Sequence, residues 1–467
     1  MSAYRSALAH TRSVLVVEGG PYGTTCARVG CMPSKLLIAA AEAAHAIAQA
    51  GRFGVHGGGL VIDGPAMMKR LREERDRFVG FVTDAIDRWP EEHRLRGRAR
   101  FVDEMLLEVG GAEGERVRVK AGRIVIATGS RPAVPPQWRE ALGERLLVND
   151  DIFDWHDLPS SVGVVGTGVI GLEIAQALHR LGVRVRLYGR SGRIGPLTDP
   201  VLQDLARSIF GHELALTPVL SQLEVLHDGD QVLLRSTDPA GQASEERFDF
   251  LLAASGRRPN IDKLGLEQAS LPLDAEGVPI FDRGTGQVGT SAVFIAGDAA
   301  DERPLLHESA DDGRIAGDNA GCWPDIRVRP RRTPLAVVFC DPQMMLAGAS
   351  HAELLAAKAR FACGEVSFED QGRSRVMGRN QGALRAYGEC GSGRVLGAEM
   401  LGPAAEHIGH LLAWSVQRGD TVQQMLDSPF YHPVIEEGLR TALRELQRAL
   451  RLGPPPVERC LDCGPGS

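Results

Sequence analysis

The sequence predicts an α/β fold. Apolar strands that run directly into glycine turns recur along the chain, in the segments IVIATG, SVGVVGTG and VFIAGD. The second segment continues as Gly166-x-Gly168-x-x-Gly171, a helical stretch, a helix stop at Gly182 and a further strand. A strand, this glycine loop and a helix in that order are typical of a dinucleotide-binding β-α-β unit. We therefore expect two Rossmann-like dinucleotide-binding domains, followed by a C-terminal α+β domain.

Composition limits the classes of protein to consider. The chain has 467 residues, 43% hydrophobic and 24% charged, which fits about three globular domains. Its formal net charge of -7 argues against a general electrostatic affinity for nucleic acid. The sequence contains no apolar run of the roughly 20 residues that a membrane span needs, and no signal-peptide pattern. We expect a cytoplasmic protein that contacts neither nucleic acid nor membrane.

The N-terminal segment resembles the second half of a β-α-β unit. A short helical pattern precedes the apolar strand RSVLVVEGG, which ends in Glu18. An acid at this position bonds the adenosine ribose in such units. Since the first strand and its glycine loop would come before the helix, we expect Met1 to be a misplaced start or the start of a fragment. Roughly ten to fifteen residues would then precede it, and without them the pyrophosphate would be held poorly.

The later segments supply further candidate positions. Gly129 and Gly256 each end an apolar strand, and Asp298 follows another. Such an Asp either caps the next helix or approaches a cofactor. From about Arg329 the sequence becomes basic and contains prolines, which is typical of a linker, and strand and helix patterns follow it.

Cys26 and Cys31 stand five positions apart, ahead of an Ala-rich helical run. A metal site would need more ligands than the nearby His45 offers, and a staple across so short a loop would gain little. Two unrelated thiols remain possible by default. Pro33 suits the first turn of a helix, so Cys31 would lie at a helix N-terminus that stabilises a thiolate. With Cys26 on an accessible loop, one buried thiolate and one exposed thiol favour redox exchange.

The segment TCARVGCMPSK resembles the redox-active motif of the pyridine nucleotide-disulfide oxidoreductases, the flavoenzyme family of dihydrolipoamide dehydrogenase, glutathione reductase and mercuric reductase. The segments VIATGSRP, GVVGTGVIGLE, AASGRRPN, FIAGDAAD, PLAVVFCDPQ and YHPVIEEG follow in the family's order. The resemblance covers nearly the whole chain and implies FAD and either NAD or NADP as cofactors.

Carried over by position, the resemblance makes Cys31 the thiol nearest the flavin and Cys26 the thiol that exchanges with substrate. It places Lys35 near the flavin N5 and pairs it with Glu173. Asp298 would contact the ribityl and phosphate region of FAD. The predicted cofactor-binding residues are Glu18, Lys35, Gly129, Gly166, Gly168, Gly171, Glu173, Arg190, Gly256, Asp298 and His307. We predict no metal ligands.

His432 and Glu437 form a second candidate pair. A His beside a Pro is often only a cap, but in HPVIEE the Pro restarts a helix and the acid five residues on can hold the imidazole in one tautomer. An oriented base of this kind deprotonates a dithiol. In the resembled family this dyad comes from the partner subunit, which implies a homodimer.

The resemblance also implies a division of the chain. We expect an FAD-binding domain at residues 1–148, truncated at its start, an NAD(P)-binding domain at 149–264, a continuation of the FAD-binding domain at 265–328, a dimerisation domain at 329–452 and a flexible tail at 453–467.

The implied function is electron transfer between NAD(P)H, FAD, the Cys26–Cys31 disulfide and a small dithiol or disulfide. Within the resembled family, the activity we favour is that of dihydrolipoamide dehydrogenase, acting on a lipoyl carrier. The alternatives are an NADPH-dependent disulfide or mercuric reductase and a flavin-free dimeric scaffold. NAD-preferring units end their second strand with an acid, whereas this chain has Gly189 there, followed by Arg190 and Arg193, which favours NADP.

The tail contains a Cys-x-x-Cys pair, Cys460 and Cys463. Such spacing is often accidental. The functional alternatives are that the pair passes electrons to a bulky or metal substrate, or binds a soft metal ion.

Overall fold

The computed structural model describes residues 1–453, so the predicted thiol pair Cys460 and Cys463 lies outside the described residues. The chain divides into two compact units. Unit 1 comprises Met1–Pro33, Arg70–Ala133 and Gly256–Arg331; unit 2 comprises Ser34–Lys69, Val134–Ser255 and the chain from Arg332 onward. Among the described helices, none combines the length and apolar character needed to span a bilayer.

Unit 1 is built from short strands. Two parallel pairs join β1 (Val16–Glu18) to β2 (Arg94–Arg96) and β6 (Ile124–Ile126) to β17 (Val293–Ile295). An antiparallel meander contains β3 (Arg98–Asp103), β4 (Leu106–Gly110) and β5 (Arg116–Lys120), and β7 (Ser130–Pro132) pairs antiparallel with β16 (Arg257–Pro259). The apolar side chains of β6 and β17 pack together with Phe101 of β3 in the core of this unit.

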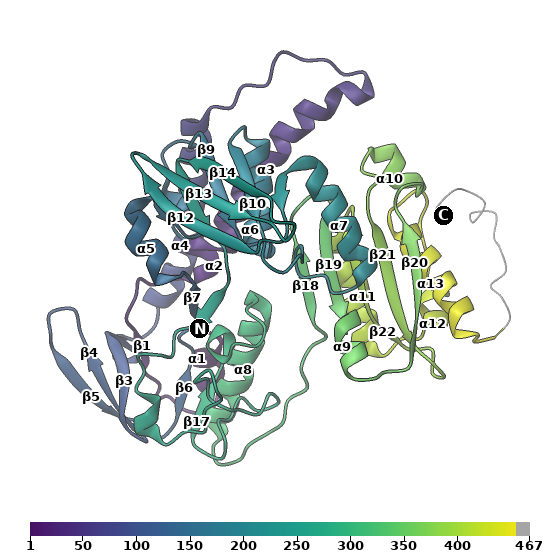
Figure 1. Cartoon of the computed structure of the whole chain (residues 1–467). Coiled ribbons are helices and arrows are strands. Elements are labelled where there is room, and N and C mark those ends of the chain that lie inside the picture. The colour runs from purple at the N-terminus through teal and green to yellow at the C-terminus, as the bar shows by residue number, and fades with distance from the viewer. Residues whose placement is uncertain (454–467) are drawn as a thin grey trace. The chain divides into compact units, whose positions relative to one another are not determined.

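Two helices of unit 1, α1 (Ser2–Ala7) and α8 (Leu306–Cys322), lie side by side (Figure 1). Gly313, Gly317 and Gly321 recur every four residues on α8, which places them on one helix face. A Cβ atom at Gly317 would lie 2.3 Å from the carbonyl oxygen of Ala3. Glycine at this position therefore lets the two backbones approach closely.

Unit 2 contains the predicted glycine-loop unit. A parallel sheet has the strand order β11-β10-β9-β15-β8, and α6 (Val169–Arg180) connects its central strands β9 and β10. The bounds are β8 Leu146–Leu147, β9 Ser161–Val165, β10 Arg184–Tyr188, β11 Ala215–Thr217 and β15 Phe250–Ala253. Every residue of β9 is buried, as expected for a central parallel strand. The order strand, glycine loop, helix, strand is thus confirmed.

The C-terminal part of unit 2 is an antiparallel sheet with helices packed on it. The strand order is β18-β19-β22-β21-β20, with β18 Leu335–Val338, β19 Gln343–Gly348, β20 Phe361–Ser367, β21 Ala383–Glu389 and β22 Val395–Gly402. Helix α13 (Glu436–Leu450) packs on β20 and β21, and α11 (Ala405–Arg418) packs on β19 and β22. The approach of α13 needs Gly364, because a Cβ there would lie 2.1 Å from the Ala442 carbonyl oxygen. This arrangement confirms the predicted α+β character.

The remaining elements complete the chain. Helix α3 (Cys31–Gln49) contains the Ala-rich run that follows the two cysteines, and the next long helix is α4 (Gly64–Asp87). The other helices are α2 Thr25–Val29, α5 Pro136–Leu142, α7 Pro200–Glu213, α9 His351–Ala356, α10 Gly372–Met377 and α12 Val422–Leu426. A second antiparallel sheet in unit 2 contains β12 Gln222–Asp228, β13 Gln231–Thr237 and β14 Ala243–Phe248.

Candidate active site

Cys26 and Cys31 are neighbours in unit 1. Cys26 lies in the short helix α2, Cys31 begins α3, and Gly30 makes the turn between the two helices. A Cβ at Gly30 would lie 3.2 Å from the Cα of Cys26, so glycine permits this tight connection. A hydrogen bond with the Cys31 thiol, together with burial, raises the pKa of the Cys26 thiol. The two sulfur atoms therefore interact directly.

The predicted exposure of the two thiols is wrong. We expected a buried Cys31 and an exposed Cys26 on a loop, but Cys31 is exposed and Cys26 is half-buried in α2. The backbone N–H groups of Cys31 and Met32 contact the sulfur of Cys26 and lower its pKa, although less than the first two effects raise it. The tight turn at Gly30 is the cause, because it folds α2 back onto the first turn of α3. The backbone amides at the N-terminus of α3 therefore donate to the sulfur of Cys26 rather than to that of Cys31.

Lys35 and Glu173 form an ion pair within unit 2. Lys35 Nζ lies 2.7 Å from Glu173 Oε2, and the Phe339 N–H donates to Glu173 Oε1 at 2.8 Å. The Lys35 ammonium also lies 4.8 Å from the centre of the Phe339 ring, within cation–π range. Glu173 is only 4% exposed, and each of its two carboxylate oxygens has a partner that compensates the buried charge. The pair is present, and its role beside a flavin stays a prediction.

Each of the three glycines of the 166–171 loop has a different structural role. A Cβ at Gly166 would lie 2.1 Å from the Ala254 carbonyl oxygen, and one at Gly171 would lie 1.9 Å from the Gly166 carbonyl oxygen. Gly168 caps the N-terminus of α6, and a Cβ there would meet nothing within 4 Å. The outer glycines thus allow tight packing, while the middle one leaves the helix N-terminus accessible. This arrangement fits a dinucleotide pyrophosphate.

The residues after β10 are those from which the sequence predicted the choice of nucleotide. Gly189 follows the strand, and a Cβ there would lie 2.4 Å from the Pro218 carbonyl oxygen. Packing therefore excludes a larger side chain, including the acid that NAD-preferring units place at this position. Arg190 and Arg193 follow and are exposed.

Three predicted cofactor residues of unit 1, Gly129, Gly256 and Asp298, lie in the turns near strand ends. Asp298 follows β17, and its carboxylate accepts hydrogen bonds from Ser130 Oγ at 2.7 Å and Ser309 Oγ at 3.0 Å. Gly129 and Gly256 have positive φ angles of 69° and 124°, and open space lies where a Cβ would stand. Accessible backbone beside an oriented carboxylate fits a bound FAD.

Glu18 and His307 lie apart from this hydrogen-bonded group. Glu18 Oε1 accepts the N–H of Gly20 at 2.7 Å at the end of β1, and His307 is exposed in the first turn of α8.

His432 and Glu437 form the predicted dyad at the start of α13. His432 Nδ1 lies 3.0 Å and 3.1 Å from the two carboxylate oxygens of Glu437. Because a carboxylate accepts, Nδ1 carries the proton, which leaves Nε2 as the basic atom. Glu437 also accepts the Val434 N–H at 3.2 Å and lies 3.5 Å from Arg440 Nη2. This arrangement orients an exposed imidazole as a proton acceptor.

The sequence reasoning missed three supporting residues. Phe339 holds Glu173 through its backbone, Ser130 holds Asp298, and Arg257 Nε donates to Ser130 Oγ at 2.9 Å. Ser130 follows Gly129 directly and Arg257 follows Gly256, so a search one residue past each predicted glycine would have found two of them. The contact of the Phe339 backbone has no sequence signal.

The chain matches known families over most of its length. Residues 1–313 match the family model described as pyridine nucleotide-disulphide oxidoreductase, and residues 335–443 match the dimerisation domain of the same family. The first match begins at Met1, and the second ends within α13.

Curated relatives carry two different names. The chain is 28% identical over 444 residues to dihydrolipoyl dehydrogenase of Bacillus subtilis, covering 94% of each sequence. It is 31% identical over 434 residues to mercuric reductase of Streptomyces lividans, covering 91% of this chain and 88% of the relative.

Solved structures share the fold. LpdA from Mycobacterium tuberculosis superimposes with a TM-score of 0.79 at 23% identity, over 95% of this chain and 96% of that one. The HOCl-induced flavoprotein disulfide reductase RclA from Escherichia coli gives 0.77 at 22% identity, over 97% of each chain.

Proposed function

Because the chain belongs to the pyridine nucleotide-disulphide oxidoreductase family, we propose that Cys26 and Cys31 are the redox pair of an FAD-dependent oxidoreductase. Enzymes of this family bind FAD and NAD(P)H, and the dimerisation domain supports a homodimer. The substrate that we propose is a small dithiol or disulfide, with dihydrolipoamide or a lipoyl carrier as the first candidate.

The interaction between the two thiols carries this proposal. Cys26 and Cys31 contact each other across Gly30, and the N-terminal amides of α3 stabilise negative charge on Cys26. A pair that interacts as two thiols can form a disulfide with little rearrangement of the turn, as thiol–disulfide exchange requires.

The exchange step takes place between two substrate thiols and the cysteine pair. A substrate thiolate attacks the Cys26 sulfur of the oxidised pair, the Cys26–Cys31 bond breaks, and Cys31 leaves as a thiolate. The second substrate thiol then attacks the first substrate sulfur in the mixed disulfide and releases Cys26. The substrate loses two electrons, which the cysteine pair gains, and two protons, of which one goes to the released Cys26 thiolate and the other to a base. We assign His432 Nε2 of the dimer's second subunit to accept a substrate proton, with Glu437 holding the imidazole.

FAD, when bound, supplies electron transfer between the nicotinamide and the cysteine pair. We propose that Gly129, Gly256 and Asp298 hold it in unit 1, and that Glu18 bonds its ribose. We assign Lys35 to the flavin N5 region, with Glu173 as its positioning partner. The Gly166–Gly171 loop would hold the pyrophosphate of the nicotinamide nucleotide.

A second candidate is an NADPH-dependent disulfide or mercuric reductase. Two observations favour it: Gly189 excludes an acid by packing, and the exposed Arg190 and Arg193 can bind a 2′-phosphate. Three of the curated relatives that the chain matches are named mercuric reductase.

Steady-state assays of the full-length protein distinguish these candidates. The absorbance spectrum is recorded first, and kcat/KM is then measured with NAD, NADH and NADPH, each with dihydrolipoamide or lipoamide, glutathione disulfide and mercuric ion. Cys26→Ser and Cys31→Ser are the controls. We expect flavin bands, turnover of lipoyl substrates above the other two, and loss of turnover in both variants. A spectrum without flavin bands would support the scaffold alternative. Turnover that survives both substitutions would show that Cys26 and Cys31 are not the redox pair.

A further inference from the structure

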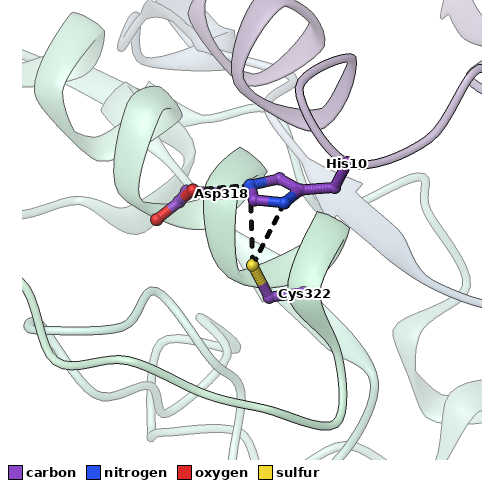
Figure 2. A group of neighbouring side chains, drawn as sticks. All are labelled: His10, Asp318 and Cys322. Atoms are coloured by element: carbon purple, nitrogen blue, oxygen red, sulfur yellow. Dashed lines mark hydrogen bonds and ion pairs between the residues drawn. The ribbon is translucent and has the colours of Figure 1, made fainter.

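His10, Asp318 and Cys322 come together in unit 1, away from the residues assigned above. His10 Nε2 lies 2.7 Å from Asp318 Oδ1, and the Cys322 sulfur lies 3.4 Å and 3.5 Å from the two ring nitrogens of His10. One nitrogen, one oxygen and one sulfur atom thus lie within 4.8 Å of one another. Figure 2 shows the imidazole facing both the carboxylate and the thiol.

The packing of the chain builds this cluster. Asp318 and Cys322 are four residues apart in the last turns of α8, which places them on one helix face. His10 follows α1, and its ring occupies the space beside Gly321, where a Cβ would lie 2.6 Å from His10 Cδ2. The glycine face that brings α1 close to α8 therefore also makes room for the imidazole.

Asp318 is fixed from its other side. Arg329 donates to Asp318 Oδ2 from Nε at 3.1 Å and from Nη2 at 2.6 Å, which leaves Oδ1 directed at His10. The arginine also offsets the carboxylate charge. Carboxylate ligands of metal ions commonly have an outer hydrogen-bond partner of this kind.

We propose that His10, Asp318 and Cys322 form a binding site for a zinc-type divalent cation. Imidazole nitrogen, carboxylate oxygen and thiolate sulfur are the donors that zinc takes at about 2.0–2.3 Å in tetrahedral sites. Such bond lengths separate neighbouring donors by roughly 3.3–3.7 Å. The 3.5 Å between His10 Nε2 and Cys322 Sγ is of this size. Because Sγ is almost equally far from both ring nitrogens, the imidazole must turn to direct its Nε2 lone pair at an ion held between Sγ and Oδ1. The shorter contact between Nε2 and Asp318 Oδ1 opens by roughly half an ångström when the ion replaces the shared proton.

Binding of the ion requires two proton movements within the cluster. The cation displaces the proton from the Cys322 thiol, and the proton between His10 and Asp318 moves to Nδ1 of the imidazole, so one proton is released to solvent. Three protein ligands leave one position for water. Because the ligands come from both the segment after α1 and the end of α8, a bound ion would link the N-terminal segment to α8 and stabilise unit 1.

Cobalt provides a direct test of the sulfur ligand. The full-length protein with FAD is prepared with Cys26, Cys31, Cys460 and Cys463 changed to Ser, so that these thiols cannot bind the probe. Co²⁺ is added, a difference absorbance spectrum is recorded, and Zn²⁺ is then titrated into the same sample. We expect a thiolate-to-cobalt charge-transfer band that saturates at one equivalent and disappears as Zn²⁺ replaces Co²⁺.

Three further variants in this background separate the cluster from other sites. Cys322→Ser should abolish the band, and His10→Gln should weaken Co²⁺ affinity at least about tenfold. Cys390→Ser removes an exposed thiol outside the cluster and should leave the band unchanged. Absence of a band, or a band that persists in Cys322→Ser, would overturn the proposal. His10→Gln keeps the test valid if Cys322→Ser does not fold, since unchanged Co²⁺ affinity in that variant also overturns it.

Discussion

His432 Nδ1 lies 3.0 Å from the carboxylate of Glu437. The Glu437 side chain is 3% exposed, whereas the His432 side chain is 57% exposed. The acid is anchored at the start of α13 and the base faces outward, so the geometry separates the orienting group from the reacting group. Nε2, the atom that does not contact Glu437, is the one available to a substrate.

Changing this dyad should slow turnover with dithiol substrates. We expect His432→Gln to lower kcat/KM by about 10²–10⁴-fold, the usual contribution of a positioned general base. Glu437→Gln keeps an oxygen acceptor but loses the charge, so its effect should be smaller and should appear chiefly in kcat. His212→Gln is the matched control, because His212 is exposed in α7 and contacts a backbone carbonyl. Equal rates for His432→Gln and the control would refute the assignment.

The buried Glu173 should stabilise the protein only while Lys35 is present. Glu173→Leu leaves Lys35 Nζ and the Phe339 N–H without this acceptor. Because the Lys35 side chain is 33% exposed and water can reach it, we expect unfolding in urea to become easier by about 1–3 kcal/mol. The double variant with Lys35→Met should recover part of this loss, because no charge is then left without a partner.

The control for this measurement is an exposed ion pair. Asp370 lies 2.8 Å from Arg375 on the surface, with both side chains more than half exposed. Asp370→Ala should change stability by less than about 0.5 kcal/mol. An equally small effect of Glu173→Leu would contradict the prediction.

Two glycine-to-alanine substitutions should change the stability of the fold in opposite directions. A Cβ at Gly171 would meet the Gly166 carbonyl oxygen at 1.9 Å, so Gly171→Ala should destabilise by about 1–3 kcal/mol and weaken binding of the nicotinamide nucleotide. Gly211 lies in α7 with nothing within 4 Å of its Cβ position, so Gly211→Ala should stabilise by about 0.5–1 kcal/mol. Thermal unfolding and nucleotide titration of the two variants check both signs.

Arg190 should determine the choice of nucleotide. Loss of a charge-assisted hydrogen bond to a 2′-phosphate costs about 1.5–3 kcal/mol, so Arg190→Glu should raise KM for NADPH roughly 10- to 150-fold and leave KM for NADH unchanged or lower. Arg235→Ala, at an exposed arginine paired with Glu245, is the control. A higher kcat/KM for NADH in the wild-type protein, unaltered by Arg190→Glu, would refute the NADP assignment.

Cys363 should react slowly with alkylating reagents. Burial raises the pKa of this thiol from its ordinary value of 9.0 to about 11. Because the folded-state pKa is raised, the folded protein keeps this proton between pH 9 and 11 while an unfolded chain loses it. The stability that the group contributes is therefore fully present below pH 9 and is lost as the pH rises through 11. Mass spectrometry after timed iodoacetamide treatment at pH 8 should show the exposed Cys390 modified well before Cys363.

Local patterns in the sequence were enough to predict the glycine-loop unit and the helix that begins at Cys31. The spacing of Gly166, Gly168 and Gly171 between an apolar strand and a helix is a local signal, and each glycine has a reason within a few residues or on the adjacent strand. The dyad of His432 and Glu437 was also predictable, since its members are five residues apart at a helix start. For the dyad, and for Gly171 beside the Gly166 carbonyl oxygen, backbone geometry over one or two turns determines which atoms meet.

Only the tertiary structure decided which thiol is buried, which backbone holds Glu173 and where His10 lies. Cys26 is the more buried thiol because the turn at Gly30 folds α2 onto α3, a detail that spacing does not specify. The Phe339 N–H reaches Glu173 across 166 positions of sequence, and His10 reaches Asp318 across 308. Contacts at such separations depend on how closely helices and strands pack, and this packing depends on every side chain in the core rather than on a local pattern.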